Sequence, residues 1–420
     1  MHPKTLLSAL ALALAPALLV TAPALAQPEA RPAWDARQAP LRGFSARELT
    51  LIAPMLERGT VALVELPHGA VLPAVHLARV VHAPAARIAD VVSDPAHYPD
   101  FMPAVGEVEV TERAGQSIAF SWRWTTSVFA LSGQAMLTRF DAPASHPERG
   151  FRIDIQRTQG DLGHGREVWR ILPRGPGRSL VLLSTRMDLR DSNYLTQSVA
   201  SASRSINRSV NIAMATGTLL RAGTEAERRS GYVATPRPAA LHAPEVDLAP
   251  LANVLRRGDM LLIESNGIQL TQSSVMSRLP QPEARVRQIM LDPVAFTQAL
   301  IPGSSATVLA ERGNARDFHW GVDLPLIGTS GDMTLSERED RVVELDATDG
   351  AMNGGRWRFR SQPLPGNATG VVGWATFDVG DTNFLLRAIV DADPAFRPGL
   401  SGAMEVMMAR ALRIRVNRRD

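Results

Sequence analysis

The dominant feature of this chain is a long internal repeat. Residues 45–228 and 245–420 align with each other at an offset that drifts from about 190 to about 199 residues. The matching segments include Leu56-Glu57-Arg58-Gly59 with Leu255-Arg256-Arg257-Gly258, Phe120-Ser121-Trp122 with Phe318-His319-Trp320, and Asp188-Leu189-Arg190-Asp191-Ser192-Asn193 with Asp378-Val379-Gly380-Asp381-Thr382-Asn383. Each copy is longer than a solenoid unit and can bury its own core. The repeat therefore predicts two similar domains with separate sheets, 45–228 and 245–420, joined by a proline-bearing linker at 229–244.

The first 26 residues have the pattern of a secretory signal peptide. Lys4 precedes an almost unbroken Ala/Leu run from Leu6 to Val20, and Ala24-Leu25-Ala26 forms an A-x-A cleavage site before Gln27. The run is short for a transmembrane helix, so cleavage is the preferred interpretation and an uncleaved anchor is the alternative. We therefore expect a periplasmic or secreted protein, with 27–44 as an unstructured lead-in.

Composition excludes several classes of protein. The 420 residues include no cysteine, so neither disulfides nor thiolate metal ligands contribute. The net charge is only +3, and 45 basic residues are interleaved with 42 acidic ones, which argues against a nucleic-acid partner. The histidines lack metal-ligand spacing, and no phosphate-binding or dinucleotide-binding glycine pattern occurs. We therefore expect no metal and no cofactor, and the sequence identifies no protein partner.

The hydrophobic pattern predicts the same order of elements in both copies. In the first copy it predicts a helix at 46–58, a hairpin at 60–66 and 72–82, a helix beginning near Pro84, and strands at 118–126, 132–140, 150–157, 166–173 and 179–188. A long amphipathic helix from about 193 to 228 closes this copy. In the second copy Pro394 and Pro398 interrupt the corresponding region, so the final helix is expected at about 401–415.

One segment carries a specific resemblance. Residues 83–103, APAARIADVVSDPAHYPDFMP, resemble the opening of START-like (SRPBCC), polyketide cyclase and coenzyme Q-binding family domains. The second copy keeps Pro282, Val286, Asp292-Pro293 and Phe296 but lacks the Tyr-Pro pair. The resemblance implies an α+β helix-grip fold in each copy, in which a curved antiparallel sheet surrounds a long C-terminal helix and leaves a hydrophobic cavity between them.

Aromatic residues recur at alternating strand positions. Period-two alternation places Phe120, Trp122 and Trp124 on one face of a strand. The same alternation separates Trp357 and Phe359 from three arginines. The candidate cavity residues are Tyr98, Phe101, Phe120, Trp122, Trp124, Glu167, Trp169, Tyr194, Phe296, Phe318, Trp320, Trp357, Phe359 and Phe384. A cavity of this kind suits a sterol, quinone, polyketide or acyl chain, and the alternative is an ordinary packed core.

Some of these candidates have a second interpretation. Glu167 stands among aromatic positions, where a raised pKa would allow acid–base chemistry, but a salt bridge at the cavity rim is the commoner outcome. Tyr98 is expected to be a packed aromatic with a satisfied hydroxyl. Asp381 or Thr382 is expected to be a helix N-cap, which would turn Phe384, like Tyr194 in the first copy, toward the sheet. We identify no catalytic set.

These observations favour a non-enzymatic, exported binding or carrier protein for a hydrophobic small molecule of the lipid, sterol, quinone or polyketide class, and they leave transient membrane contact open. The alternatives are a cyclase-like or aromatase-like enzyme, because tandem copies of this fold occur in that class, and an envelope interaction module with collapsed cavities. Convergent ionisable side chains inside a cavity would favour the enzyme. The first copy, whose terminal helix lacks the proline breaks, is expected to be the better receptor.

Overall fold

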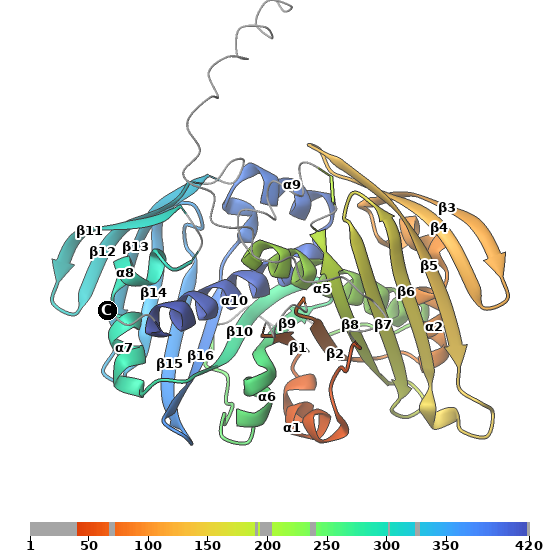
Figure 1. Ribbon diagram of the computed structural model, residues 1–420, viewed down its shortest axis with the longest axis horizontal. Coiled ribbons are helices and arrows are strands. Elements are labelled where there is room, and N and C mark those ends of the chain that lie inside the picture. The colour runs from red at the N-terminus through yellow and green to blue at the C-terminus, as the bar shows by residue number, and fades with distance from the viewer. Residues whose placement is uncertain are drawn as a thin grey trace, which may run out of the picture.

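The chain forms two curved wings of antiparallel sheet around two long central helices. The computed structural model describes residues 40–66, 72–189, 192–193, 204–235, 241–300, 303–323 and 328–417, with backbone alone for 204–207. The predicted signal peptide, most of the lead-in and Tyr194 lie outside these ranges. The two central helices are α5 (Arg204–Arg229) and α10 (Phe396–Asn417), and they run across the concave side of the wings (Figure 1).

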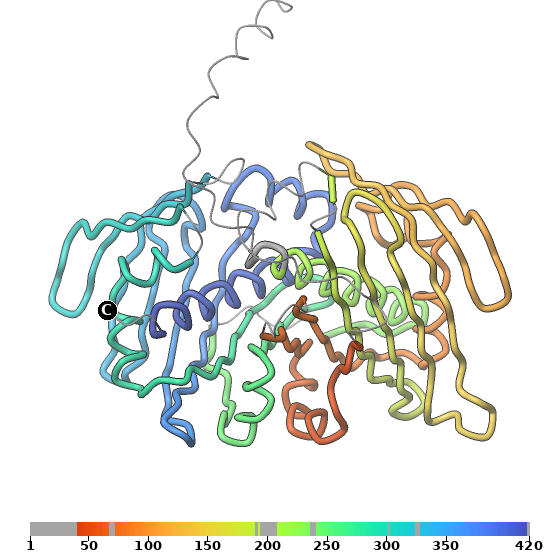
Figure 2. Tube along the Cα trace, in the orientation of Figure 1, coloured from red at the N-terminus to blue at the C-terminus, as the bar shows by residue number. Residues whose placement is uncertain are grey.

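The first half of the chain builds one wing (Figure 2). Its elements before α5 are α1 (Ala46–Leu56), β1 (Thr60–Glu65), β2 (Val75–Val81), α2 (Ala85–Val92), η1 (Pro95–His97), α3 (Tyr98–Phe101), β3 (Val105–Ala114), β4 (Ser117–Thr125), β5 (Ala130–Asp141), η2 (Pro147–Arg149), β6 (Phe151–Gly160), β7 (His164–Pro173) and β8 (Ser179–Asp188). The strand β3 was not among the predicted strands, although Val108 and Val110 alternate with glutamates; most of its residues are exposed.

The second half repeats this order in the other wing. Its elements before α10 are α6 (Ala252–Arg257), β9 (Gly258–Asn266), β10 (Gln269–Leu279), α7 (Glu283–Met290), α8 (Pro293–Thr297), β11 (Ser304–Arg312), β12 (Ala315–Val322), β13 (Thr329–Glu337), β14 (Val343–Gly350), β15 (Arg356–Leu364), β16 (Ala368–Thr376), η4 (Val379–Asp381) and α9 (Phe384–Ala392). Each half is therefore an α+β helix-grip unit, as predicted.

The expectation of two separate sheets is wrong. The sixteen strands found in the described residues form one sheet in the order β11-β12-β13-β14-β15-β16-β10-β9-β1-β2-β8-β7-β6-β5-β4-β3. The two wings are joined where β1 pairs with β9 in antiparallel fashion. The sequence could not reveal this pairing, because both strands are continuous hydrophobic runs that identify burial but not a partner. The boundaries 45–228 and 245–420 of the two repeats remain a prediction.

The junction of β1 and β9 has approximate two-fold symmetry. Ala62 lies opposite Leu261, which is its repeat equivalent at an offset of about 199 residues, and the register runs symmetrically away from this pair. The contact is therefore isologous, like the interface of a symmetric dimer within one chain. A Cβ atom on Gly258 would lie 2.2 Å from the carbonyl oxygen of Val64. We infer that glycine is needed here because the strands approach too closely for a side chain.

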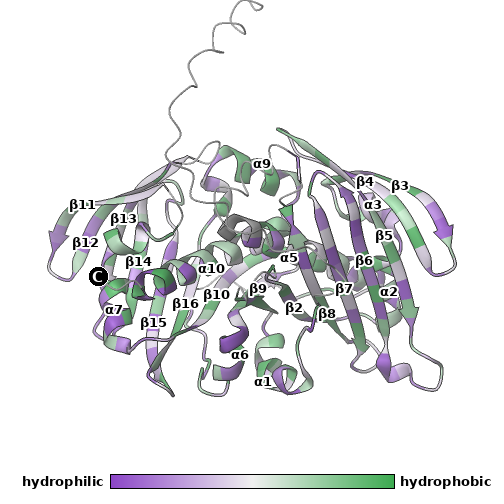
Figure 3. Cartoon of the chain, viewed as in Figure 1, coloured by the Kyte–Doolittle hydropathy of each residue, from purple (hydrophilic) through white to green (hydrophobic). Residues whose placement is uncertain are grey.

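Both faces of the junction are buried. Ala62 and Val64 belong to the core on the side of the central helices, whereas Val61 and Leu63 belong to a second core under α1 and α6. This explains why β1 is hydrophobic without alternation. Farther out in the wings one face meets solvent, and residues of β5 alternate between exposed and buried. Figure 3 shows the resulting bands of hydrophilic and hydrophobic residues along these strands.

Glycine pairs recur at the same place in both wings. Gly133 in β5 lies opposite Gly160 in β6, and Gly331 in β13 lies opposite Gly350 in β14. Gly160 and Gly350 have φ values of 133° and 71°, a backbone conformation that favours glycine. The register shifts next to each pair, and β-bulges of this kind increase the bend of a sheet. The curvature that wraps each wing around its helix is thus built into the repeat.

Two details of the terminal helices differ from the predictions. The helix α10 begins at Phe396 and runs through Pro398 instead of starting near residue 401. Proline is tolerated in the first turn of a helix because the N–H that it lacks has no intrahelical partner there. The N-cap of α9 is Asn383, whose side chain accepts a hydrogen bond from the N–H of Leu386, and not Asp381 or Thr382.

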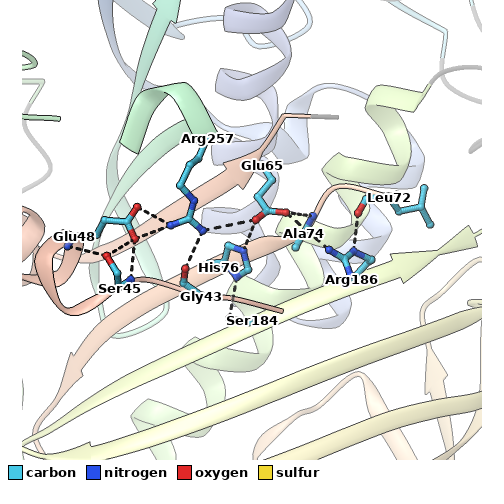
Figure 4. A network of polar contacts seen from close by, with 10 residues as sticks. All are labelled: Gly43, Ser45, Glu48, Glu65, Leu72, Ala74, His76, Ser184, Arg186 and Arg257. Atoms are coloured by element: carbon cyan, nitrogen blue, oxygen red, sulfur yellow. Dashed lines mark hydrogen bonds and ion pairs between the residues drawn. The ribbon is translucent and has the colours of Figure 1, made fainter. Parts of the chain in front are cut away.

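A network of ion pairs ties the two halves together on the α1 and α6 side of the junction (Figure 4). Arg257 of the second half donates to both carboxylate oxygens of Glu48 at 2.6 Å and lies 3.7 Å from Glu65. Its repeat equivalent, Arg58, donates to Glu264 at 3.1 Å. Each half thus supplies an arginine that pairs with a glutamate of the other half.

Glu65 anchors the centre of this network. The nearest ring nitrogen of His76 lies 3.1 Å from a carboxylate oxygen of Glu65 (Figure 4). Burial by itself raises the pKa of Glu65, but the hydrogen bond and charge of His76, a backbone N–H and the charge of Arg186 lower it to about 2. Glu65 therefore carries its negative charge at neutral pH and holds the surrounding cations in place.

The close approach at the junction can be tested with Gly258→Ala. The added methyl group would collide with backbone that cannot move without separating β1 from β9. We expect a loss of about 1–3 kcal/mol in the free energy of unfolding, measured by urea denaturation. The control is Gly106→Ala, because nothing lies within 4 Å of a Cβ at that position. Equal stability of the two variants would contradict the argument.

Glu405 provides a second test, through the pH dependence of stability. This side chain of α10 is fully buried, and neither carboxyl oxygen has a hydrogen-bond partner. Burial raises its pKa to about 8, from an ordinary value of 4.5. The folded state therefore retains this proton to a higher pH than the unfolded state. The resulting contribution to stability is complete below pH 4.5 and is lost as the pH rises through 8.

We expect Glu405→Gln to remove this loss. Between about pH 5 and about pH 8 its free energy of unfolding should fall less than that of the unsubstituted protein, by about 1.4 kcal/mol per pH unit. Urea denaturation at several pH values measures the slope. The exposed Glu107, whose side chain is 74% accessible, gives the control Glu107→Gln, which should keep the original slope. Parallel slopes for Glu405→Gln and the unsubstituted protein would show that the carboxyl is ionised in the fold.

Candidate functional site

Each half encloses a cavity between its curved sheet and the central helices. The cavity of the first half, called here the first cavity, has a volume of about 110 Å³. Aromatic side chains from β4 and β7 form one wall, and α5 forms the opposite wall. The residues lining it are Val91, Val92, Tyr98, Met102, Ala104, Val105, Phe120, Trp122, Trp124, Ala135, Ile155, Arg157, Leu162, Glu167, Trp169, Met214, Gly217, Thr218, Arg221, Ala222, Asp393 and Phe396.

The ionisable groups of the first cavity are paired with one another. Arg157 donates to Glu167 at 2.5 Å, and Arg221 donates to Asp393 at 2.5 Å and 2.9 Å. The hydroxyl of Tyr98 donates to the carbonyl oxygen of Val92 at 2.6 Å, and burial followed by the charge of Glu167 raises the pKa of this phenol. Tyr98 is thus a packed aromatic with a satisfied hydroxyl, and Glu167 takes part in a salt bridge, the commoner of its two predicted outcomes.

The cavity of the second half, called here the second cavity, is larger and more apolar. Its volume is about 250 Å³. It is lined by Ser209, Val210, Phe296, Thr297, Leu300, Phe318, Trp320, Val322, Thr329, Met333, Leu345, Met352, Trp357, Val379, Thr382, Asn383, Leu386, Ile389, Leu400, Ala403, Met404, Met407 and Met408. Among the described residues, none that lines this cavity is ionisable.

A smaller pocket continues from the second cavity toward α7. It has a volume of about 30 Å³ and shares four lining residues with the second cavity, namely Phe296, Phe318, Leu345 and Met408. Phe359, Val343 and Val371 are among the other residues that line it. We call this space the tail pocket.

Both cavities combine residues from the two repeats. The helix α5 contributes Met214 and Thr218 to the first cavity and Val210 to the second cavity. Asp393 and Phe396 come from the second half and line the first cavity. The ring of Phe396 lies 5.5 Å from that of Trp124, which closes this wall across the two halves. Neither site is therefore complete within one repeat.

Most of the aromatic candidates predicted from the sequence line these spaces. Tyr98, Phe120, Trp122, Trp124, Glu167 and Trp169 line the first cavity, whereas Phe296, Phe318, Trp320, Trp357 and Phe359 line the second cavity or the tail pocket. Phe101 is buried behind Tyr98, with ring centroids 5.9 Å apart. The prediction that Phe384 turns toward the sheet is wrong. This residue is 59% exposed, because the Asn383 cap sets α9 so that Leu386 and Ile389 face the cavity instead.

The sequence analysis missed the helical wall of the second cavity. Leu400, Ala403, Met404, Met407 and Met408 occupy one side of α10. Their spacing of three and four residues was a usable signal for an apolar helix face. Methionine is flexible and polarisable, so this wall can adapt to ligands of different shape.

Metal chemistry finds no support in the part of the chain that the structure describes. Within these ranges no cluster of three or more His, Cys, Asp or Glu residues could hold a metal ion. No helix found there is both long enough and apolar enough to cross a membrane.

Comparison with known proteins supports the fold assignment. Residues 81–213 match the family model described as "Polyketide cyclase / dehydrase and lipid transport". A search of curated protein sequences found no match. The predicted family resemblance is therefore confirmed by a match that covers the first half from the end of β2 through β8 and part of α5.

Three solved structures to which the chain is similar are a lipid transfer protein and two aromatase/cyclases. A STAR-related lipid transfer protein from Xanthomonas axonopodis is 14% identical, with 40% of this chain and 94% of that chain covered and a TM-score of 0.33. The Zhui aromatase/cyclase from Streptomyces sp. R1128 is 18% identical, with coverage of 39% and 100% and a TM-score of 0.28. The di-domain ARO/CYC StfQ from the steffimycin biosynthetic pathway is 12% identical, with coverage of 80% and 99% and a TM-score of 0.27.

Proposed function

We propose that this chain, a START-like protein whose residues 81–213 match the polyketide cyclase and lipid transport family, is a binding or carrier protein for a hydrophobic small molecule. The observation that carries the proposal is the second cavity. A space of about 250 Å³ lined by aromatic, aliphatic and methionine side chains has room for an apolar ligand and little to hold water. The second half is thus the principal receptor, which reverses the ranking expected from the sequence.

The distribution of ionisable groups favours a carrier over an enzyme. Acid–base catalysis needs a titratable group that can reach the substrate, and the described lining of the second cavity contains none. The alternative of a collapsed interaction module rested on broken helices around Pro394 and Pro398. The helices are interrupted at Pro394, between α9 and α10, but α10 runs unbroken through Pro398. The second cavity has a volume of about 250 Å³, which argues against a collapsed module.

A cyclase-like activity is the second candidate, and the first cavity favours it. Arg157, Glu167, Arg221 and Asp393 converge there beside Tyr98. Both carboxylates are held by arginines, and the phenol donates to backbone, so none of these groups is free to accept a substrate proton. Catalysis would require an incoming substrate to separate one of the pairs. The carrier function therefore stands as the better proposal.

We also propose that the protein is exported. The proposal is supported by the pattern of residues 1–26, with Lys4, the apolar run and the A-x-A site before Gln27. A periplasmic or extracellular carrier would shield an apolar molecule while it crosses water. Transient contact with a membrane for loading or release is compatible with this role.

Filling each cavity in turn tests the binding function and its location. Leu400→Trp adds a bulky ring inside the second cavity, and Met214→Trp is the matched change in the first cavity. Titration with the apolar fluorescent probe N-phenylnaphthylamine should give a Kd that is weaker by about tenfold or more for Leu400→Trp and little changed for Met214→Trp. Absence of probe binding to the unsubstituted protein would contradict the carrier proposal.

The export proposal is tested by the mass of the mature protein. When the complete chain is expressed with its leader in a bacterial host, the intact mass of the soluble product should correspond to a chain that begins at Gln27. Replacing Ala24 and Ala26 by bulky residues should block cleavage. Recovery of the full-length chain in the membrane fraction without these changes would indicate an uncleaved anchor.

A further inference from the structure

A polar pocket lies at one end of the β1–β9 junction, apart from the two apolar cavities. Its volume is about 310 Å³, and we call it the junction pocket. Its walls come from the end of α1, from β2, from the end of α5 and from the turn between β9 and β10. None of its described lining residues also lines the first or the second cavity. The junction pocket is therefore a separate site with a different chemistry.

Most of the charge in the junction pocket is neutralised by neighbouring side chains. Among the described residues, three arginines and two glutamates line it. Arg58 donates to Glu264 at 3.1 Å, and Arg178 donates to Glu57 at 2.8 Å. These ion pairs account for two of the three arginines. One arginine and one glutamate of the lining remain outside them.

The remaining arginine is Arg79 on β2. Within the described residues the only hydrogen bond of its side chain runs from Nη1 to the hydroxyl of Thr60 at 3.3 Å, and no carboxylate lies within 4.0 Å. Burial lowers the pKa of its guanidinium, whereas the charge of Glu227 raises it. Nε is sealed from solvent, but the side chain as a whole is only half-buried. Its terminal nitrogens can therefore be reached from the pocket.

The remaining glutamate is Glu227, near the end of α5. Its side chain is only 9% exposed. Oε1 accepts a hydrogen bond from the backbone N–H of His82 at 3.0 Å and lies 3.5 Å from Nδ1 of the same residue. Within the described part of the chain, Oε2 has no hydrogen-bond partner, and it is not sealed from solvent. One oxygen of a largely buried carboxylate thus remains open to a donor in the pocket.

The second half closes the equivalent position with an internal ion pair. At the offsets of the repeat, about 199 to about 190 residues, Thr60, Arg79 and Gly223 correspond to Asp259, Ser277 and Arg413. Arg413 donates to Asp259 at 2.9 Å, and the hydroxyl of Ser277 donates to the same carboxylate at 2.7 Å. In the first half threonine stands in place of this aspartate. Arg79 therefore lacks the carboxylate that the repeat provides on the other side.

An aromatic wall lies beside the two charged groups. Tyr232 stacks on His82, with ring centroids 4.2 Å apart and ring planes inclined by 9°. Tyr232 is 38% exposed, so part of its ring and hydroxyl face the pocket and solvent. A phenol donates to carboxylates, and the face of an aromatic ring attracts ammonium groups. A ligand with only a negative charge would meet the carboxylate of Glu227, and one with only a positive charge would meet Arg79.

We infer that the junction pocket binds a small zwitterion, such as a free amino acid, whose carboxylate pairs with Arg79 and whose ammonium group pairs with Glu227. Such a ligand has no net charge, and it satisfies both groups that the fold leaves outside its ion pairs. The site is independent of the apolar cavities and of the carrier function proposed for them.

Isothermal titration calorimetry of the purified protein at neutral pH and low salt tests the ligand class. Glycine, β-alanine and γ-aminobutyrate carry both charges at increasing separation. Propionate carries only the carboxylate, and propylamine carries only the ammonium group. We expect at least one of the three zwitterions to bind about tenfold more tightly than propionate and propylamine, because two charge-assisted contacts form instead of one.

Three variants locate the binding. Arg79→Met and Glu227→Gln each remove one charge and should weaken the best zwitterion by about tenfold or more. Thr60→Asp restores the carboxylate found in the second half, so it should pair with Arg79 and abolish binding without loss of stability in urea denaturation. The control is Arg123→Gln, which removes an exposed arginine that lies 4.0 Å from Glu107 and should leave the Kd unchanged.

Two results would overturn the inference. One is that no zwitterion binds more tightly than propionate and propylamine. The other is that Glu227→Gln and Thr60→Asp bind the best zwitterion as tightly as the unsubstituted protein does. Tighter binding of propionate than of any zwitterion would identify a simple anion site and would also contradict the role of Glu227.

Discussion

The pairing of β1 with β9 is the interaction on which the rest of this structure depends. It joins two repeats through strands that would otherwise be exposed edges, and unpaired edges are a liability for a soluble sheet. Because the pairing is isologous, each kind of contact between the halves occurs twice, once from each half. Arg257 binds Glu48 and Glu65 of the other half, and Arg58 binds Glu264 in return. The junction is therefore stabilised by the backbone pairing of β1 with β9 and by ion pairs on the α1 and α6 side.

The junction also determines the geometry of both cavities. With the strands of the two halves held in one sheet, α5 and α10 must share a single concave surface, and they pack against each other across it. Gly399 allows this contact, since a Cβ there would lie 2.7 Å from the Cα of Ala213. Each of these helices therefore contacts residues of the other repeat. The two cavities are lined in part by this helix pair, although their linings differ in polarity.

The linings of the two cavities differ in charge. In the first cavity Arg157 and Arg221 neutralise the buried carboxylates of Glu167 and Asp393, so polar surface is present but already satisfied. In the second cavity charge is absent from the described lining. Similar folds thus present different chemistry, because side chains at repeat-equivalent strand positions changed while glycines and bulges that shape the sheet were kept.

Local sequence patterns determined much of this protein. Period-two alternation identified Phe120, Trp122, Trp124 and Trp357 as residues of one sheet face, because the pleat of a strand sends alternate side chains to opposite sides. The repeat and the segment at 83–103 identified the helix-grip fold. Only the tertiary structure decided that β1 pairs with β9 and that Phe384 faces solvent. These features depend on contacts between residues far apart in the chain, and local periodicity carries no information about such partners.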